Sequence, residues 1–145
     1  MLAAGMAMPA TAFSFGKERK LRIALVGTGI RGIGFWGERL ANQYPDILEF
    51  VGLCDINPGR LELARKKISR SAAIYTEFAP MIRETKPDLV IVTTKDSNHH
   101  EFIIQGLEMG CDVLTEKPLT TDERKCQDII DAERKSGKKL IVGLN

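Results

Sequence analysis

Short runs of apolar residues recur along the chain and alternate with longer stretches in which apolar and polar residues mix. The runs are nearly uniform in hydrophobicity, which is typical of strands buried on both faces and therefore of a parallel sheet. The longer stretches carry apolar residues three or four positions apart, which is the spacing of amphipathic helices. The pattern predicts alternating strands and helices, with strands over residues 21–26, 48–54, 72–75, 88–93, 111–115 and 139–144.

The predicted helices have recognisable starts and ends. Asn57 and Ser97 are suited to cap the helices that follow them, and residues 120–123 (TTDE) match the capping-box pattern. Gly110 and Gly137 are suited to end the last two helices. The apolar positions expected to face the core are Ile33, Trp36, Leu40 and Tyr44 in the first helix, Leu61, Ala64 and Ile68 in the second, and Cys126, Ile129 and Ile130 in the last.

Alternating buried strands and helices favour an α/β fold with a doubly wound parallel sheet. Right-handed crossovers then give the strand order 3-2-1-4-5-6. A length of 145 residues corresponds to one domain, which we place at residues 21–145.

Composition excludes several classes of protein. Hydrophobic residues make up 43% of the chain and charged residues 28%, so a mainly disordered state is excluded. A net charge of +2 is too small for a protein that binds the nucleic-acid backbone, and no apolar run approaches the length of a membrane span. The three cysteines and two adjacent histidines have no metal-ligand spacing, and neither a disulfide framework nor a metal site is expected.

The first twenty residues differ from the rest. Residues 1–15 are small and apolar, and residues 10–12 (ATA) match the A-x-A pattern cut by signal peptidase. The basic segment that precedes the apolar part of an export signal is missing, as it would be if translation began further upstream. Residues 1–20 are therefore expected to be an export-signal-like segment; the alternative is a disordered apolar tail on a cytoplasmic protein.

The strongest chemical signal is G-x-G-x-x-G over residues 27–32, directly after the first predicted strand and at the start of a helix. In that context the pattern indicates a dinucleotide-binding loop, whose glycines permit a tight turn, phosphate approach and close helix packing. Backbone N–H groups and the positive end of the helix bind the phosphates. A plain strand-to-helix turn is the alternative. The motif predicts cofactor contacts from Gly27, Thr28, Gly29, Ile30, Arg31 and Gly32.

An acidic residue ends the second predicted strand. Asp55 follows Gly32 by 23 residues, where a carboxylate binds the adenosine ribose hydroxyls and repels a 2′-phosphate. Ile56 comes next, in place of a residue that would favour that phosphate, so the sequence predicts NAD rather than NADP. Arg60 is close enough to weaken this inference unless it is a solvated residue of the helix. The alternative for Asp55 is a structural residue at the start of that helix.

Ligands of doubly wound sheets bind at the carboxyl ends of the strands, where the strand order reverses. Thr93, Thr94 and Asp96 follow the fourth predicted strand, and Glu116 and Lys117 follow the fifth. The Lys117 ammonium is suited to polarise a substrate oxygen beside a nicotinamide, or to move its own proton. The alternative is a surface lysine before a proline.

These motifs resemble the N-terminal domain of the Gfo/Idh/MocA oxidoreductases, which include glucose-fructose oxidoreductase and inositol dehydrogenase. The resemblance rests on GTGIRG, the acid in LCDINP, the stretch VIVTTKDSNHHEFIIQGLEMGCDVL and E-K-P over residues 116–118. It covers residues 20 to 145. The family usually has Thr-Pro after the fourth strand, whereas this chain has Thr94 and Lys95.

The resemblance implies a Rossmann fold, NAD or NADP as cofactor, and a small carbohydrate-like substrate such as a sugar or polyol. Lys117 matches the family lysine that contacts the nicotinamide ribose and the reacting oxygen, and His99 matches a histidine in the loop after the fourth strand. The family's substrate domain would begin where this chain ends. We therefore expect the cofactor half of an enzyme, inactive alone, whose homo-oligomers would form through the other domain.

Two other functions stay open at this point. One is an NAD-dependent glycosidase of the same superfamily, in which transient oxidation permits elimination. The other is a non-catalytic dinucleotide-binding module. Many members of the family carry twin-arginine export signals, which agrees with export to the periplasm.

Overall fold

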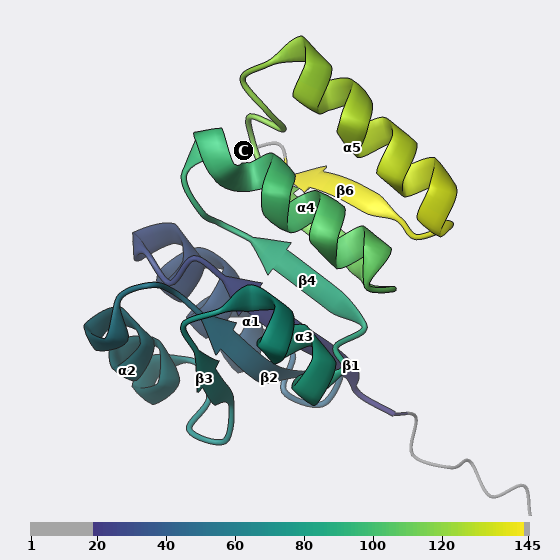
Figure 1. Cartoon of the computed structure of the whole chain (residues 1–145). Helices are drawn as coiled ribbons and strands as arrows, with labels where there is room; N and C mark the ends of the chain where they lie inside the picture. The colour runs from purple at the N-terminus through teal and green to yellow at the C-terminus, as the bar shows by residue number, and fades with distance from the viewer. Residues whose placement is uncertain (1–18, 144–145) are drawn as a thin grey trace, which may run out of the picture.

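The computed structural model describes residues 19–143 and contains a six-stranded parallel sheet with the order β3-β2-β1-β4-β5-β6 (Figure 1). This order confirms the predicted doubly wound fold. Strand ends differ from the prediction by one residue at most. The strands are β1 (Leu21–Val26), β2 (Leu48–Cys54), β3 (Ala73–Tyr75), β4 (Leu89–Val92), β5 (Asp112–Glu116) and β6 (Leu140–Gly143).

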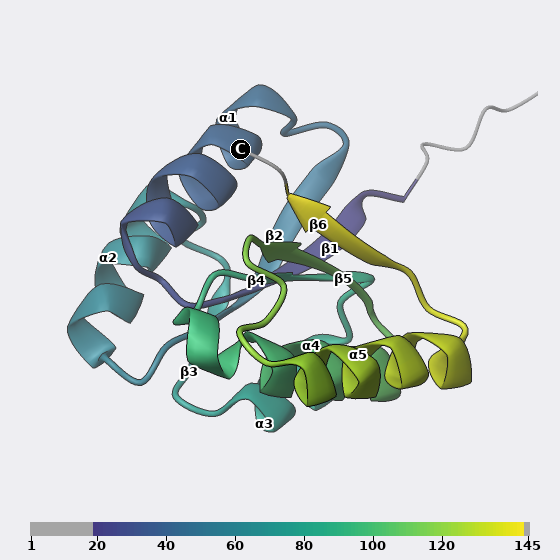
Figure 2. The same cartoon turned by 90° about the horizontal axis from the view of Figure 1, so that it is seen from above.

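Helices cover both faces of the sheet. Figure 2 shows α1 and α2 on one side and α3, α4 and α5 on the other. This arrangement leaves the carboxyl ends of the central strands for the loops that carry the predicted site. The helical segments are η1 (Gly32–Glu38), α1 (Arg39–Gln43), α2 (Pro58–Lys67), α3 (Phe78–Thr85), η2 (Asp96–Asn98), α4 (His99–Glu108) and α5 (Glu123–Ser136).

Each face of the sheet has its own apolar core, because successive residues of a strand point to opposite sides. In β1, Ala24 and Val26 belong to the cluster that includes buried residues of α3, α4 and α5. Ile23 and Leu25 belong to the cluster that includes residues of η1, α1 and α2. Burial on both faces explains why the strands are uniformly apolar in sequence.

The predicted inner faces are only partly right. The face of α2 is confirmed, with Leu61, Ala64 and Ile68 all buried. In α5, Ile129 is buried, whereas Cys126 and Ile130 are half-buried. Tyr44 is 45% exposed because α1 ends at Gln43, which leaves the tyrosine beyond the helical repeat that was expected to turn it inward.

Ser97 does not cap α4, contrary to the prediction. Residues 96–98 form a 3₁₀ turn in which the backbone N–H of Asn98 donates to the carbonyl of Lys95 at 2.9 Å. The α-helix begins only at His99. The residue at the N-cap position of α4 is Asn98, which makes no side-chain cap hydrogen bond, and the Ser97 hydroxyl in this tighter turn donates to the Asn98 side chain.

The cap of α5 is also displaced from its predicted position. Asp122 has an extended backbone, and its carboxylate accepts from the backbone N–H of Lys125 at 3.1 Å. The Thr120 hydroxyl instead accepts from the backbone N–H of Asp122. The predicted capping box therefore begins two residues early, because a carboxylate is itself a favoured cap. Asn57 caps α2 as predicted, by accepting from the backbone N–H of Arg60.

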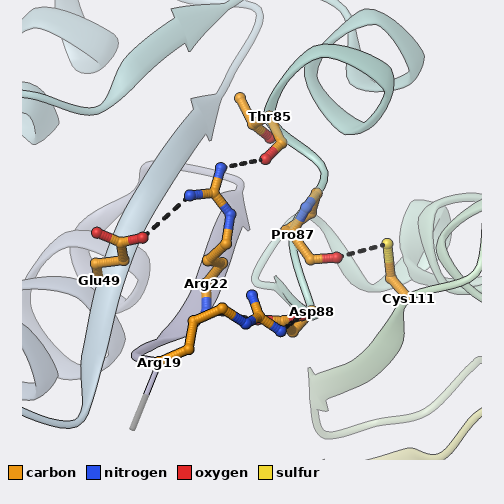
Figure 3. A network of polar contacts seen from close by, with 7 residues as sticks. All are labelled: Arg19, Arg22, Glu49, Thr85, Pro87, Asp88 and Cys111. Atoms are coloured by element: carbon orange, nitrogen blue, oxygen red, sulfur yellow. Dashed lines mark hydrogen bonds and ion pairs between the residues drawn. The ribbon is translucent and has the colours of Figure 1, made fainter. Parts of the chain in front are cut away.

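A polar network holds the end of the sheet opposite the glycine loop (Figure 3). Arg22 donates from its guanidinium to Glu49 and to the carbonyl of Thr85, and its backbone N–H donates to Asp88 at 2.9 Å. Arg19 pairs with the same aspartate. The hydrogen bond from Arg19 is the main cause that lowers the pKa of Asp88. The network joins β1, β2, the end of α3 and the start of β4.

One sequence expectation concerns the N-terminal part of the chain. The export-signal-like segment over residues 1–20 lies outside the described residues, except for its last two. Across residues 19–143, no helix combines the length and the hydrophobicity needed to cross a membrane.

The three cysteines are free thiols: Cys54 ends β2, and burial raises its pKa to about 12.

Candidate functional site

The glycine loop joins β1 to η1 and packs tightly against the loop after β4. Gly27 has a φ of +90°, where glycine is favoured, and a Cβ there would lie 2.5 Å from the carbonyl oxygen of Thr93. The Thr93 hydroxyl donates to the carbonyl of Gly27 at 2.6 Å. A Cβ on Gly32 would overlap that same carbonyl. The tight turn and the close helix packing therefore both depend on glycine.

Gly29 has the opposite environment. Among residues 19–143, no heavy atom beyond its chain neighbours lies within 4 Å of the point where its Cβ would stand. Nothing in the fold itself requires glycine here. The open space over this backbone is what a loop needs if a phosphate group is to approach its N–H groups.

The helix that follows the loop is irregular. Residues Gly32–Glu38 form a π-helical segment before α1 begins, where the sequence pattern predicted an ordinary helix. Such segments often occur at functional sites. Trp36 lies on this segment, and its Nε1 donates to Glu116 Oε1 at 2.5 Å. The irregular turn thereby connects the glycine loop to the end of β5.

Asp55 lies directly after β2, is 7% exposed and accepts four hydrogen bonds. Its Oδ2 accepts from the backbone N–H and the hydroxyl of Thr28 at 2.8 and 3.0 Å. Its Oδ1 accepts from the backbone N–H of Asn57 at 2.9 Å and from Arg60 Nη2 at 2.7 Å. The Asp55 carboxylate thus holds the glycine loop through its hydrogen bonds with Thr28, and it forms an ion pair with Arg60.

These contacts determine the charge of Asp55. Burial alone raises the pKa of the carboxyl, but the hydrogen bonds from Arg60, Asn57 and Thr28 outweigh it and leave the pKa below its ordinary value. Asp55 is therefore ionised at neutral pH. Because its four hydrogen bonds fill its acceptor sites, this ionised carboxylate can accept from ribose hydroxyls in place of Arg60, whose side chain is half-exposed.

A hollow of about 350 Å³ lies beside Asp55, and we call it the Asp55 hollow. Ile56, Phe78 and Phe102 give it apolar walls, whereas Asp55, Arg60 and Lys95 supply its charges. The two phenylalanine rings pack edge to face with centroids 5.3 Å apart. Apolar walls beside charged groups suit a flat aromatic group attached to a polyol, as in adenosine.

A second hollow, the Lys117 hollow, has a volume of about 240 Å³. All of its lining residues are residues predicted from the sequence. Thr93 and Thr94 line both hollows, and they follow β4, which pairs with β1 where the strand order reverses. The Lys117 hollow is lined by Arg31, Thr93, Thr94, Asp96, His99, Glu116 and Lys117.

Glu116, beside Lys117, is held firmly. It is 8% exposed, and its Oε1 accepts from Arg31 Nη2 at 2.6 Å and Nε at 2.9 Å in addition to Trp36. Arg31 also stacks over the ring of Phe35. Arg31 of the glycine loop is thus hydrogen-bonded to Glu116, the residue before the candidate catalytic Lys117.

The two hollows collect most of the predicted site. Three of its residues line neither hollow: Thr28 is buried against Asp55, Ile30 is 94% exposed, and Gly32 is packed under the loop. The aromatic walls of the Asp55 hollow are not predictable from the sequence pattern. Trp36 was expected to pack in the core and not to be a polar partner, because an aromatic residue at helical spacing gives no sign of a hydrogen bond.

A glycine loop at the point where strand order reverses, an ionised acid after β2 and two hollows that share one loop define a dinucleotide-binding Rossmann domain. Sequence comparison agrees. The profile of the "Oxidoreductase family, NAD-binding Rossmann fold" (GFO_IDH_MocA) matches residues 21–144. The chain belongs to this family, and the predicted resemblance and cofactor class are confirmed.

Relatives of known activity are similar to this chain over the same region. The inositol 2-dehydrogenase/D-chiro-inositol 3-dehydrogenase of Lactiplantibacillus plantarum is 31% identical over 117 residues, which are 78% of this chain and 33% of that protein. The inositol 2-dehydrogenase of Salmonella typhimurium is 34% identical, over 78% of this chain and 34% of that protein. The chain spans about a third of the length of these relatives.

A solved structure gives the same picture. The WlbA dehydrogenase of Chromobacterium violaceum, in complex with NADH and UDP-GlcNAcA, matches with a TM-score of 0.81 and 31% identity. The match covers 87% of this chain and 35% of that one. The WlbA dehydrogenase of Bordetella pertussis matches with a TM-score of 0.79 and 26% identity, over 86% of this chain and 37% of that one.

Proposed function

We propose that this chain is the cofactor-binding part of an NAD-dependent oxidoreductase that transfers a hydride between nicotinamide and a carbon–oxygen bond of a sugar, polyol or related substrate. One observation carries the proposal. The Lys117 hollow and the Asp55 hollow share Thr93 and Thr94 at the carboxyl end of β4, beside the glycine loop. One dinucleotide can therefore reach both.

The residues of the chain fit such a cofactor in three places. Asp55 and the apolar walls of its hollow would hold the adenosine, and the open backbone at Gly29 would receive the phosphates. The Lys117 hollow would hold the nicotinamide end. When bound, NAD supplies the hydride acceptor, and NADH supplies the donor.

The Lys117 ammonium is the group suited to act on the substrate. The side chain is exposed at the rim of the hollow, and within residues 19–143 no hydrogen bond or ion pair occupies its ammonium. It can donate a hydrogen bond to a substrate oxygen and hold or accept the proton that leaves or joins that oxygen. The polyol and sugar-nucleotide dehydrogenases among the relatives support a carbohydrate-like substrate.

Calorimetric titration with NAD tests the binding part of the proposal. The variant Gly29→Val fills the space that the phosphates need, whereas Gly34→Val adds the same group at a second glycine whose Cβ would also stand in open space. We expect Gly29→Val to weaken NAD binding at least about tenfold, and Gly34→Val to leave it unchanged. Equal affinity in the two variants would show that the loop does not bind the phosphates.

The chemical part is tested by following NAD reduction with myo-inositol and sugar nucleotides, in this chain and in longer forms of the protein that contain it. Lys117→Met is expected to lose turnover by about a hundredfold or more, which is the contribution of a positioned acid or base and exceeds any loss of NAD affinity from the missing cofactor contact. Turnover that survives this substitution would remove the lysine from the mechanism.

We also propose that the first twenty residues direct export, on the strength of the apolar run and the A-x-A pattern alone. Cell fractionation of the chain with and without residues 1–20 tests this. Retention of both forms in the cytoplasm would contradict it.

A further inference from the structure

His99 has an unusual environment for a residue at the start of a helix. It is 1% exposed, and both ring nitrogens lie at hydrogen-bond distance from backbone carbonyls. Nδ1 is 2.9 Å from the carbonyl oxygen of Pro118, and Nε2 is 3.0 Å from that of Thr94. A ring with one proton donates to one of these carbonyls, and a ring with a proton on each nitrogen donates to both. The doubly protonated imidazole therefore links the loop after β4 to the turn after β5.

Lys117 lies in sequence between two residues that are held in place. Pro118, which follows it, is held by the His99 ring, and Glu116, which precedes it, is held by Arg31 and Trp36. Lys117 itself has no such anchor among residues 19–143, because its side chain is exposed and its ammonium is unpaired there. The backbone position of the lysine is therefore set by its two neighbours, one of which, Pro118, is held by the His99 ring.

We propose that His99 is a positioning residue for Lys117: its ring ties the Lys117–Pro118 turn to the loop of Thr94 and so fixes the wall of the Lys117 hollow. The inference rests on the proposed function, because it assigns the nicotinamide end of the dinucleotide to that hollow. It gives His99 a role through the backbone of the turn, in place of direct contact between a ring nitrogen and the cofactor.

The two ends of the dinucleotide separate this role from a general structural one. His99 and Lys117 line only the Lys117 hollow, whereas adenosine and its ribose are assigned to the Asp55 hollow. Losing the bridge should weaken ligands that carry the nicotinamide riboside and spare ADP, which lacks both the nicotinamide and its ribose. A variant that merely loosened the domain would weaken both ligands alike. The ratio of the two affinities is therefore the informative quantity.

The test is calorimetric titration of the chain with NADH and, separately, with ADP. His99→Phe keeps a planar aromatic ring and removes both nitrogens. His99→Asn and His99→Gln each return one N–H donor, near the positions of Nδ1 and Nε2. His100→Phe is the matched control, because that neighbouring ring has an unbonded Nδ1 and only a 4.0 Å contact with Glu101. Circular dichroism checks that each variant folds.

We expect His99→Phe to lower NADH affinity about tenfold, which corresponds to the net loss of one or two hydrogen bonds, and to change ADP affinity less than about twofold. His99→Asn and His99→Gln should fall between this variant and the wild type, and His100→Phe should match the wild type. If His99→Phe does not fold, an NADH-to-ADP affinity ratio lowered about threefold in the other two variants supports the role.

Equal losses for the two ligands, or an unchanged ratio in all three His99 variants, would overturn the positioning role and leave the proposed function intact. A wild-type chain that is folded and binds neither ligand would overturn the proposed function and this inference with it.

Discussion

Replacing Asp55 by alanine should destabilise the domain as well as weaken cofactor binding. The carboxylate accepts two hydrogen bonds from Thr28, a residue with no exposed surface. Without it, the backbone N–H and the hydroxyl of Thr28 are left buried with no acceptor. Each unsatisfied buried donor costs about 1–3 kcal/mol, so Asp55→Ala should lower the free energy of unfolding by about 3 kcal/mol.

Two further variants divide this loss into its parts. Asp55→Asn keeps one oxygen that can accept from Thr28, and we expect it to cost about half as much. Arg60→Met removes only the ion pair to a half-exposed guanidinium, and we expect it to cost much less than Asp55→Ala. Urea denaturation followed by circular dichroism gives the free energies, provided that the m-values agree. The reasoning is refuted if Asp55→Ala costs no more than Arg60→Met.

This prediction affects how binding data on Asp55 are interpreted. A weaker NAD affinity in Asp55→Ala would have two causes: the lost contact with the ribose, and a glycine loop that has lost the hydrogen bonds between Thr28 and the Asp55 carboxylate. The two effects can be separated only if binding is measured without denaturant and at a temperature at which the variant is fully folded. A binding loss that persists in the better folded Asp55→Asn would then indicate the ribose contact.

Three other outcomes are expected. Gly32→Ala should destabilise the domain by about 1–3 kcal/mol in urea denaturation, because its Cβ meets backbone, whereas Gly34→Ala, with open space around it, should change little. Arg60→Glu should lower NADP affinity about fivefold more than NAD affinity in calorimetry, because the guanidinium beside Asp55 is the group placed to attract a 2′-phosphate; equal effects would exclude that role. The pKa of Asp88 is lower in the folded than in the unfolded chain, so its stabilising contribution is complete above about pH 4 and is lost as the pH falls through the folded pKa. Asp88→Asn should therefore reduce the dependence of the unfolding free energy on pH in the acid range. An unaltered slope would contradict the ion-pair network.

The sequence was sufficient to predict the strands and to select most of the residues that line the two hollows. Strands that are buried on both faces are uniformly apolar, so they can be recognised in the sequence. The glycine motif is diagnostic when it stands between a predicted strand and a predicted helix, as it does here. Asp55, Thr93 and Lys117 followed from the rule that ligands bind at the carboxyl ends of strands. These are consequences of topology, and topology is what apolar patterning encodes.

The helix starts and the contacts between loops were less accessible. Asp122 and Thr120 are both acceptable caps, and only the extended backbone at Asp122 decides between them. The aromatic walls of the Asp55 hollow, Phe78 and Phe102, lie on different helices, and no local signal connects them. Such pairs depend on tertiary packing, which a pattern of three- or four-residue spacing does not report.

His99 shows the same limit most clearly. Its place in the loop after β4 was expected from resemblance alone, as a residue near the cofactor. Only the structure shows that both ring nitrogens lie against carbonyls of two separate loops. The partner Pro118 is 19 residues away in sequence, and no spacing rule links the two.

The central claim is that one dinucleotide spans both hollows, with adenosine at Asp55 and nicotinamide at Lys117. A crystal structure of the chain with NADH tests this most directly. The account predicts phosphates over the backbone of Gly29, ribose hydroxyls at the Asp55 carboxylate and the nicotinamide ring in the Lys117 hollow. Adenine in the Lys117 hollow, or NADH bound away from the glycine loop, would contradict it.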